Sequence, residues 1–243
     1  MQLTDAEIRE ILIREKKRKK KRKKLVRRIG LLILFICVLV LAIGIFVNRD
    51  AKIMGRGVIF IDAGHGGVDG GSKVGDRLEK DDTLRLTLAV KEELQELGFK
   101  VYTSRTKDED VDRAERGKIA NKKKAQLFVS IHRNQANEGN GVEVYIPSTN
   151  DAASRLLGEK VLAALVSQGF EERSVRVGTL VTENDDYLEN SVPDMPSCLV
   201  EVGFVSSGKD NKLFDDNLKE NAKSMALAIE ETFAELYESD EQE

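Results

Sequence analysis

Nineteen consecutive residues, from Ile29 to Val47, carry no charge and are almost entirely apolar. At a helical rise of about 1.5 Å per residue, such a run is just long enough to cross a hydrocarbon core of about 30 Å. The stretch before it, from Lys16 to Arg28, is rich in Lys and Arg, whereas residues 48–52 are nearly neutral. By the positive-inside rule the sequence predicts one membrane-spanning helix, with the N-terminus in the cytoplasm and the chain from Asn48 onward outside.

A cleaved signal peptide is the alternative reading of this segment. The basic stretch and the apolar run are both unusually long for a signal peptide, and no A-x-A-like cleavage site follows, so we expect an uncleaved anchor. The expected organisation is a basic cytoplasmic tail (1–28), a transmembrane anchor (29–47), a linker (48–56), a folded domain (57–237) and an acidic C-terminal tail (238–243).

The charges are divided unevenly along the chain. Residues 1–28 hold thirteen Lys or Arg and four Asp or Glu, a balance of +9, so the remainder carries −12 of the total of −3. An acidic domain repels polyanions, and nucleic acid is therefore not an expected partner. The Lys/Arg run could be an arm that binds nucleic acid or a partner. Its position just before the apolar run is better explained by a topogenic signal that also contacts anionic headgroups. The only cysteines, Cys37 and Cys198, provide no disulfide framework and no paired thiolates for a metal.

Apolar runs and amphipathic stretches alternate after residue 56. Strands are expected at 57–62, 100–104, 126–131, 141–146, 175–181 and 197–204, with 141–146 at an edge of the sheet. Helices are expected from about residue 79 to Gly98, which is suited to end a helix, and over 112–124, 151–168 and 217–237. This order predicts an α/β fold: a single domain with a mixed, mainly parallel β-sheet flanked by helices.

The chain has only two histidines, His65 and His132, and each directly follows an apolar strand. Functional groups gather at the carboxyl ends of strands in open α/β sheets, so both histidines can meet Glu201 from a third strand. One strand-end histidine alone is more often structural, but two suggest a metal site of histidine and carboxylate ligands. Glu79, which opens the helix after the glycine-rich loop 63–77, is the candidate third ligand, although an acidic residue there also suits the helix dipole.

Five of the glycines in that loop lie close together, at positions 64, 66, 67, 70 and 71. A phosphate-binding loop would need GxGxxG or GxxxxGK[ST], and neither pattern occurs there. We interpret the glycines as allowing the backbone to pack closely around a metal ligand.

Four segments occur in order along the domain: IFIDAGHGG, LEKDDTL, LFVSIHRN and PSCLVEVGFVSS. Together they resemble the zinc-dependent N-acetylmuramoyl-L-alanine amidases of the type-three group, from residue 57 to about residue 235. The resemblance implies that His65, Glu79 and His132 bind Zn²⁺ and that Glu201 is the catalytic general base and acid. Residues 57–237 would then be an amidase catalytic domain.

The resemblance also implies the reaction and the partners. A metal-bound water would attack the lactyl carbonyl of N-acetylmuramic acid in peptidoglycan and release the amino group of L-alanine, in cell-wall remodelling. Peptidoglycan and, through residues 29–47, the cell membrane are the expected partners; the resemblance names no protein activator. Because the segment between His132 and Glu201 is compact and no wall-binding repeat is seen, the chain is similar to the anchored sporulation and germination amidases.

Three positions depart from the family's pattern: Thr83, Arg133 and Ser207. Arg133 and Asn134 follow the second histidine and are predicted to contact substrate, although Arg133 could equally pair with a surface acid. Three other functions stay open: a zinc amidase or peptidase acting on another bond, a catalytically silent wall-binding protein, and an interaction protein with a structural metal site. The presence of all four expected catalytic residues weakens the alternative of a catalytically silent protein. A structural zinc site usually has four protein ligands, and with both histidines used and no paired cysteines the fourth would have to be another carboxylate.

Overall fold

The computed structural model describes residues 18–24, 28, 30–31, 34–40 and 55–238. The chain divides into two units, residues 1–51 and 52–243, and each is described by itself. In the first unit, residues 18–24 and 34–40 are helical. Among the described residues, no helix is both long enough and apolar enough to cross a membrane. Much of the expected anchor (29–47), and nearly all of the linker (48–56) and the acidic tail (238–243), lie outside the described residues.

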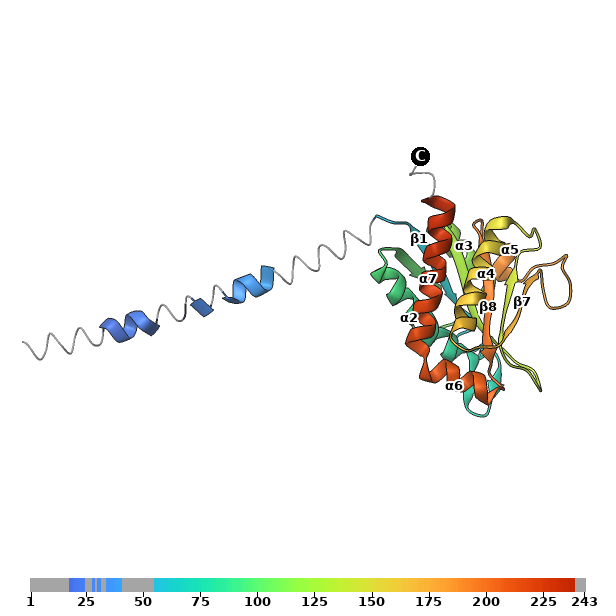
Figure 1. Ribbon diagram of the computed structural model, residues 1–243, viewed down its shortest axis with the longest axis horizontal. Helices are drawn as coiled ribbons and strands as arrows, with labels where there is room; N and C mark the ends of the chain where they lie inside the picture. The colour runs from blue at the N-terminus through green and yellow to red at the C-terminus, as the bar shows by residue number, and fades with distance from the viewer. Residues whose placement is uncertain (1–17, 25–27, 29, 32–33, 41–54, 239–243) are drawn as a thin grey trace, which may run out of the picture. The chain divides into compact units, whose positions relative to one another are not determined.

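The second unit is built on a six-stranded sheet (Figure 1), in the order β4-β1-β5-β8-β6-β7. Its strands are β1 (Val58–Ala63), β4 (Lys100–Thr103), β5 (Leu127–Asn134), β6 (Val142–Ile146), β7 (Glu172–Val177) and β8 (Ser197–Phe204). Strands β4, β1, β5 and β8 run parallel to one another, β6 is antiparallel to β8, and β7 is parallel to β6. The predicted mixed, mainly parallel sheet is confirmed.

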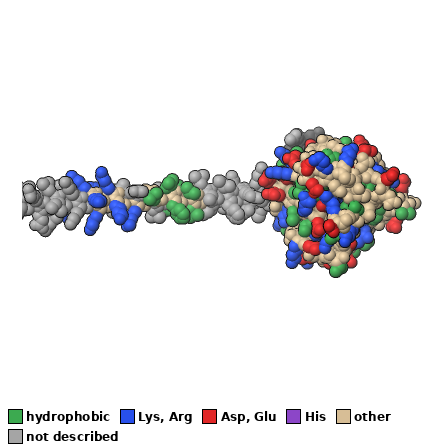
Figure 2. All heavy atoms as spheres, turned by 90° about the horizontal axis from the view of Figure 1, so that it is seen from below, with side chains coloured by type: hydrophobic (Ala, Val, Ile, Leu, Met, Phe, Trp, Pro, Cys, Tyr) green, Lys and Arg blue, Asp and Glu red, His purple; other side chains and the backbone are tan. Residues whose placement is uncertain are grey.

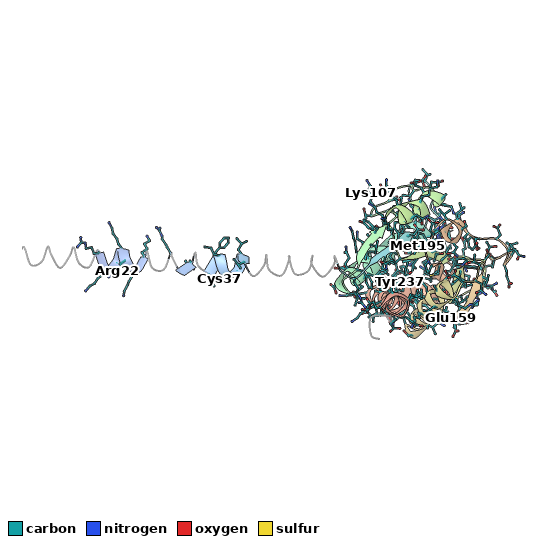
Figure 3. All side chains as sticks on the ribbon, turned by 90° about the horizontal axis from the view of Figure 1, so that it is seen from above. Arg22, Cys37, Lys107, Glu159, Met195 and Tyr237 are labelled. Carbon is teal, nitrogen blue, oxygen red and sulfur yellow. The ribbon has the colours of Figure 1, made fainter. Side chains whose placement is uncertain are left out.

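Helices cover both faces of this sheet. One layer contains α2 (Glu79–Glu96), α4 (Ala152–Ser167) and α7 (Leu218–Tyr237), and the large apolar core lies between it and the sheet. The other face carries α3 (Arg113–Lys122) and the short α5 (Leu188–Ser191), while α6 (Gly208–Asp216) contacts β8 and α7. In Figure 3, Glu159 on α4 and Tyr237 on α7 lie on one side, and Lys107, in the loop that leads to α3, lies on the other.

Side-chain alternation along the strands explains the two layers. In β1, Ile59 and Ile61 belong to the core under α2, whereas Phe60 belongs to the smaller cluster near α3. Phe60 stacks on Phe128 of β5 with ring centroids 5.4 Å apart. Since both faces are covered, the central strands are mostly apolar on both faces, which explains why they appear in the sequence as nearly continuous apolar runs.

Local signals set the helix ends. The Asp112 side chain accepts hydrogen bonds from the Ala114 and Glu115 amides and so begins α3. Gly98 follows the end of α2 with φ of 96°, a conformation that favours glycine and was expected at this position. The predicted helix ends are thus confirmed where capping chemistry is clear.

Three details of the predicted fold were wrong. Strand β6 is not an edge strand: it lies between β8 and β7, and all five of its residues are buried. Strand β7 ends at Val177 instead of continuing to 181, because Gly178, with φ of 77°, turns the chain. The two-residue strands β2 (Lys73–Val74) and β3 (Arg77–Leu78) and the helices α5 and α6 were not anticipated, since none has a long periodic pattern.

Acidic and basic side chains are interspersed over the visible face of the domain (Figure 2), without a continuous basic surface on that face. This distribution agrees with the acidic balance of the domain in the sequence.

Candidate active site

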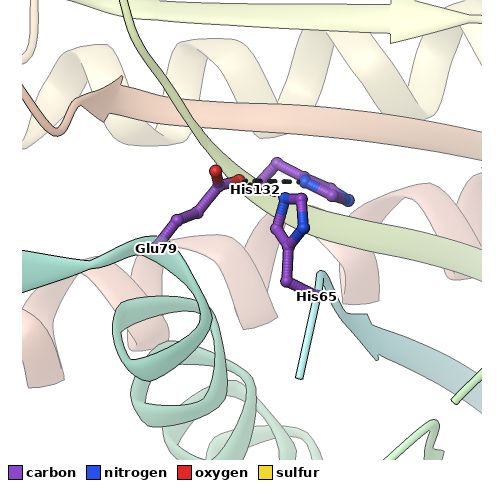
Figure 4. Close-up of side chains that lie close together, drawn as sticks. All are labelled: His65, Glu79 and His132. Atoms are coloured by element: carbon purple, nitrogen blue, oxygen red, sulfur yellow. Dashed lines mark hydrogen bonds and ion pairs between the residues drawn. The ribbon is translucent and has the colours of Figure 1, made fainter. Parts of the chain in front are cut away.

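Three side chains from separate segments converge at one edge of the sheet (Figure 4). His65 lies in the loop after β1, Glu79 is the first residue of α2, and His132 lies near the end of β5. One ligand atom from each lies within 4.8 Å of the others. The three residues that the sequence predicted as metal ligands are therefore brought together.

The distances within this group fit a small divalent ion. Glu79 Oε1 is 3.1 Å from His65 Nε2 and 3.0 Å from His132 Nδ1. Zinc–nitrogen and zinc–oxygen bonds of about 2.0–2.1 Å place neighbouring tetrahedral ligands about 3.3 Å apart, close to these separations. The donor set is also one that zinc accepts, so the residues present fit such an ion.

Glycines make room for these ligands, as expected. A Cβ at Gly64 would be 2.4 Å from His132 Cε1. A Cβ at Gly71, where φ is 63°, would be 2.6 Å from His65 Cδ2 and 2.8 Å from Glu79 Oε2. No other residue fits at these two positions without displacing a ligand.

Glu79 is buried and held by several donors. Its Oε1 accepts a hydrogen bond from the Arg133 amide at 3.0 Å, and its Oε2 accepts one from the Ser72 amide at 2.9 Å. Burial alone would raise the pKa of Glu79, but the adjacent rings of His132 and His65 hold it well below its usual range. These contacts favour the charged carboxylate form of Glu79, and its position at the N-terminus of α2 favours that form as well.

The two imidazoles differ in their surroundings. His65, with φ of 60°, is partly exposed, and its Nδ1 is 2.8 Å from Asp69 Oδ2. His132 is buried, and its Nε2 has no hydrogen-bond partner among the described residues. Burial lowers the pKa of each ring, but the hydrogen bond to Glu79 outweighs it, raising the pKa of His65 and bringing that of His132 to about 9.

Glu201 lies beside this group, on β8. Its Cα pairs in register with that of His132, so both side chains project from the same face of the sheet. Glu201 Oε2 is buried without a hydrogen-bond partner among the described residues, and burial raises the pKa of Glu201 to about 7. A carboxyl group that titrates near neutral pH is suited to accept and return a proton.

A cavity of about 590 Å³ connects these groups. His65, Glu79, His132 and Glu201 all line it, together with Asn134, Tyr187 and Glu189. Such a volume is in the range of small-molecule sites, so part of a substrate can reach the ligands and Glu201 together.

Arg133 has a different position from the one expected. Its guanidinium is buried, 2.6 Å from Asp82 Oδ2, and donates to the carbonyl oxygens of Val202 and Phe204 at 2.9 and 3.2 Å. These partners hold the Arg133 side chain inside the fold, and Arg133 also lines the active-site cavity, so its contact with substrate stays a prediction. Arg133 pairs with an acid, as in the alternative to substrate contact, but this acid, Asp82, is buried and does not lie on the surface.

The other two departures from the family's pattern also have structural roles. Thr83 Oγ1 donates to the carbonyl oxygen of Gly64 at 2.7 Å and so supports the loop that carries His65. Ser207 is the N-cap of α6 and accepts a hydrogen bond from the Asp210 amide at 3.1 Å.

Sequence reasoning missed two carboxylates near the histidines, Asp69 and Glu189. Asp69 lies four residues after His65 in the same glycine-rich loop, and its spacing was a usable signal. Glu189 lies in α5, is buried, and approaches His132 Nε2 to 4.0 Å. No pattern around residue 189 distinguishes it from an ordinary surface acid, and only the tertiary structure reveals it.

The fold and this cluster define an α/β protein with a two-histidine, one-carboxylate candidate metal site beside a partly buried carboxylate, Glu201, whose Oε2 has no hydrogen-bond partner among the described residues; this is the arrangement of a metallohydrolase. Residues 59–231 match the model of a family described as N-acetylmuramoyl-L-alanine amidase. The match covers more than half of the chain, and the chain belongs to this family.

Named relatives agree with this assignment. The germination-specific N-acetylmuramoyl-L-alanine amidase of Bacillus subtilis is 29% identical over 175 residues, 64% of this chain and 70% of that protein. The sporulation-specific amidase of the same organism is 32% identical over 180 residues, 72% and 68% of the two chains. The catalytic domain of CwlV, an amidase from Bacillus (Paenibacillus) polymyxa var. colistinus, superimposes with a TM-score of 0.62 at 30% identity, covering 72% of this chain and 97% of that one.

Proposed function

We propose that this chain hydrolyses the amide bond between N-acetylmuramic acid and L-alanine in peptidoglycan, with His65, Glu79 and His132 holding a zinc ion. The observation that carries the proposal is the convergence of these three side chains and Glu201 on one cavity, in a chain of the amidase family. Zinc in such a site, when bound, lowers the pKa of water to about 7 and polarises a carbonyl oxygen.

Glu201 moves the proton. The reaction joins a water oxygen to the lactyl carbonyl carbon and breaks the carbon–nitrogen bond, whose electron pair leaves with the L-alanine nitrogen. The Glu201 carboxylate takes a proton from the attacking water and returns it to that nitrogen, so the carboxylate is regenerated. Burial raises the pKa of Glu201 to about 7, which suits both transfers near neutral pH.

Asn134 is the proposed substrate contact. It follows Arg133 at the end of β5 and lines the cavity, which supports a polar contact with the glycan or the stem peptide. Asn134→Ala should raise KM severalfold with little change in kcat; an unchanged KM would exclude the contact.

The products test the reaction. The purified full chain should release from peptidoglycan free peptides that begin with L-alanine and should leave the glycan strands intact. New amino termini at another stem-peptide residue would identify a peptidase instead, and new reducing ends a glycosidase. Binding to peptidoglycan without any release would identify a wall-binding protein.

We also propose that residues 29–47 anchor the protein in the cell membrane as a single pass, with residues 1–28 in the cytoplasm and the catalytic domain outside. The uncharged run and the +9 balance before it support this topology. The full chain should stay with membranes after alkaline extraction, and a chain lacking residues 29–47 should not. Protease added to intact protoplasts should remove the domain; protection of the domain would reverse the proposed topology.

The named relatives support a role in spore formation or germination. Expressed in place of the germination-specific amidase of Bacillus subtilis, this chain should restore germination, and the Glu201→Gln variant should not. If the unmodified chain and Glu201→Gln both restored germination, the role in germination would not depend on hydrolysis by this chain.

A further inference from the structure

Each histidine of the candidate metal site has one nitrogen near Glu79 and the other facing a different carboxylate. In His65, Nε2 is near Glu79 and Nδ1 is 2.8 Å from Asp69 Oδ2. In His132 the two nitrogens are exchanged: Nδ1 is near Glu79, and Nε2 is 4.0 Å from Glu189 Oε1. The pattern is the same for both rings, although the 4.0 Å between Glu189 Oε1 and His132 Nε2 is longer than a hydrogen bond.

His132 Nε2 lacks any other partner. The atom is buried and makes no hydrogen bond to the described residues. A buried N–H group left without an acceptor is unfavourable by about 1–3 kcal/mol, so an approach of about 1 Å by a neighbouring carboxylate is favoured. Glu189 is a carboxylate that already faces this nitrogen.

Arg113 holds Glu189 in place. Arg113 Nε donates to Glu189 Oε1 and Nη2 donates to Oε2, each at 3.0 Å, which joins α3 to α5. The Glu189 side chain is 1% exposed, whereas that of Arg113 is 53% exposed. Because a carboxylate oxygen can accept more than one hydrogen bond, Oε1 can still accept a hydrogen bond from the His132 Nε2–H group.

Glu189 is on the wrong side of the ring to be a metal ligand. His132 Nδ1 is 3.0 Å from Glu79 Oε1, which makes Nδ1 the nitrogen placed to bind a metal together with Glu79. Glu189 faces the opposite nitrogen. Its position is that of a carboxylate which orients a metal-binding histidine without touching the metal.

We propose that Glu189, held by Arg113, is a positioning residue for His132: its carboxylate accepts the Nε2–H group and thereby keeps Nδ1 unprotonated and directed at the metal. This inference rests on the metal site of the proposed function. Asp69 has the corresponding geometry at His65.

Zinc affinity is the first test, measured on the full chain by competition with a chelating dye. Glu189→Ala should weaken zinc binding by about 10–100-fold. Glu189→Gln keeps one acceptor oxygen and should lose less. Glu143→Gln is the matched control, because Glu143 is also buried and bound by a partly exposed arginine, Arg176, and among the described residues it has no hydrogen bond or ion pair with a histidine. The zinc affinity of this variant should stay within about threefold of wild type.

The protonation of the His132 ring is the second test, one that a merely structural role would not change. The chain has only two histidines, so selective ¹⁵N labelling gives two imidazole spin systems. In the zinc-loaded wild type, His132 should carry its proton on Nε2, with slow exchange against solvent. Glu189→Ala should accelerate that exchange and leave the His65 signals unchanged.

The outcomes separate this inference from the proposed function. If Glu79→Ala abolishes zinc binding while both Glu189 variants bind zinc as wild type does, with unchanged His132 signals, the role of Glu189 is overturned and the metal site stands. If zinc binding is absent in wild type or survives Glu79→Ala, the metal site and the role of Glu189 both fall. Should Glu189→Ala fail to fold, Glu189→Gln and its His132 signals decide.

Discussion

The two histidines reach the same carboxylate by different routes. His65 lies in a glycine-rich loop whose carbonyl oxygens are held from outside the sheet: Arg105 donates to Gly64 O at 3.0 Å, and Arg116 donates to His65 O at 3.2 Å. His132 lies within β5, and its place follows from the register of the sheet. The loop half of the site therefore depends on local backbone conformation, and the sheet half depends on the packing of the whole domain.

Substitution of the two histidines should test this contrast most strongly. His65→Asn and His132→Asn should each weaken zinc binding by more than about 1,000-fold, beyond the 10–100-fold typical of outer partners. Asn tolerates the positive φ of residue 65, so backbone strain is not added there. Their effects on the metal-free protein should differ.

His132→Asn should lower the free energy of unfolding by about 2–3 kcal/mol, because it leaves a buried cavity where the imidazole was and removes one hydrogen-bond donor from the buried Glu79 carboxylate. His65→Asn should lower it by less than about 1 kcal/mol, since His65 is partly exposed. Denaturant unfolding of both metal-free variants measures the difference, and equal losses would remove the distinction between the two halves.

Two carboxylates, Glu201 on the sheet and Asp69 in the loop, should contribute opposite pH dependences to stability. Burial raises the pKa of Glu201 from 4.5 to about 7, so the folded protein keeps a proton that the unfolded chain releases. The free energy of unfolding should therefore fall as pH rises from about 4.5 to 7. Metal-free Glu201→Gln should be more stable than wild type by about 3 kcal/mol at pH 8 and equally stable at pH 4.

Asp69 supplies the comparison in the loop half. Despite some burial, hydrogen bonds from the Gly71 amide and His65 lower the pKa of Asp69. Its contribution to stability is present above its unfolded pKa and is lost as pH falls through the lowered value. Asp69→Asn should thus be less stable than wild type at neutral pH and equally stable in acid. If the free energy of unfolding that Asp69 contributes instead fell as pH rises, as expected for Glu201, the lowered pKa of Asp69 would be contradicted.

A smaller effect should come from Gly71→Ala, which acts on the loop half alone. The new Cβ would meet His65 and Glu79, and we expect about a tenfold loss of zinc affinity, in the lower range for residues that orient ligands. Gly75→Ala is the matched control, because Gly75 has nearly the same φ, 61° against 63°, with nothing within 4 Å of the added Cβ. Both variants should lose about 1–2 kcal/mol of stability through backbone strain, and only Gly71→Ala should lose metal.

The sequence predicted the parts of the molecule in which local pattern and chemistry coincide. Continuous apolar runs gave the central strands, and the strand-end positions of His65 and His132 indicated one site, as the structure confirms. Gly98, which was expected to end a helix, follows the C-terminal end of α2. These features depend on neighbours in the sequence, which is why they could be predicted without the fold.

Long-range partners could not be predicted in this way. Arg133 looked like a surface or substrate-binding residue because nothing near it in sequence shows that Asp82 and the Phe204 carbonyl would surround it. Strand β6 looked like an edge strand because its antiparallel pairing with β8 is not encoded locally. Glu189 needed both the α3–α5 contact and the orientation of His132 to become visible.

The most direct test of the account is reconstitution of the metal-depleted full chain with zinc, followed by release of L-alanine-terminated peptides from peptidoglycan. In wild type, activity should rise linearly to one zinc per chain and then level off. Glu201→Gln should bind the same one zinc and release peptides at least about 100-fold more slowly. Full activity without zinc, or wild-type activity in zinc-loaded Glu201→Gln, would contradict the claim that these four residues form one hydrolytic centre.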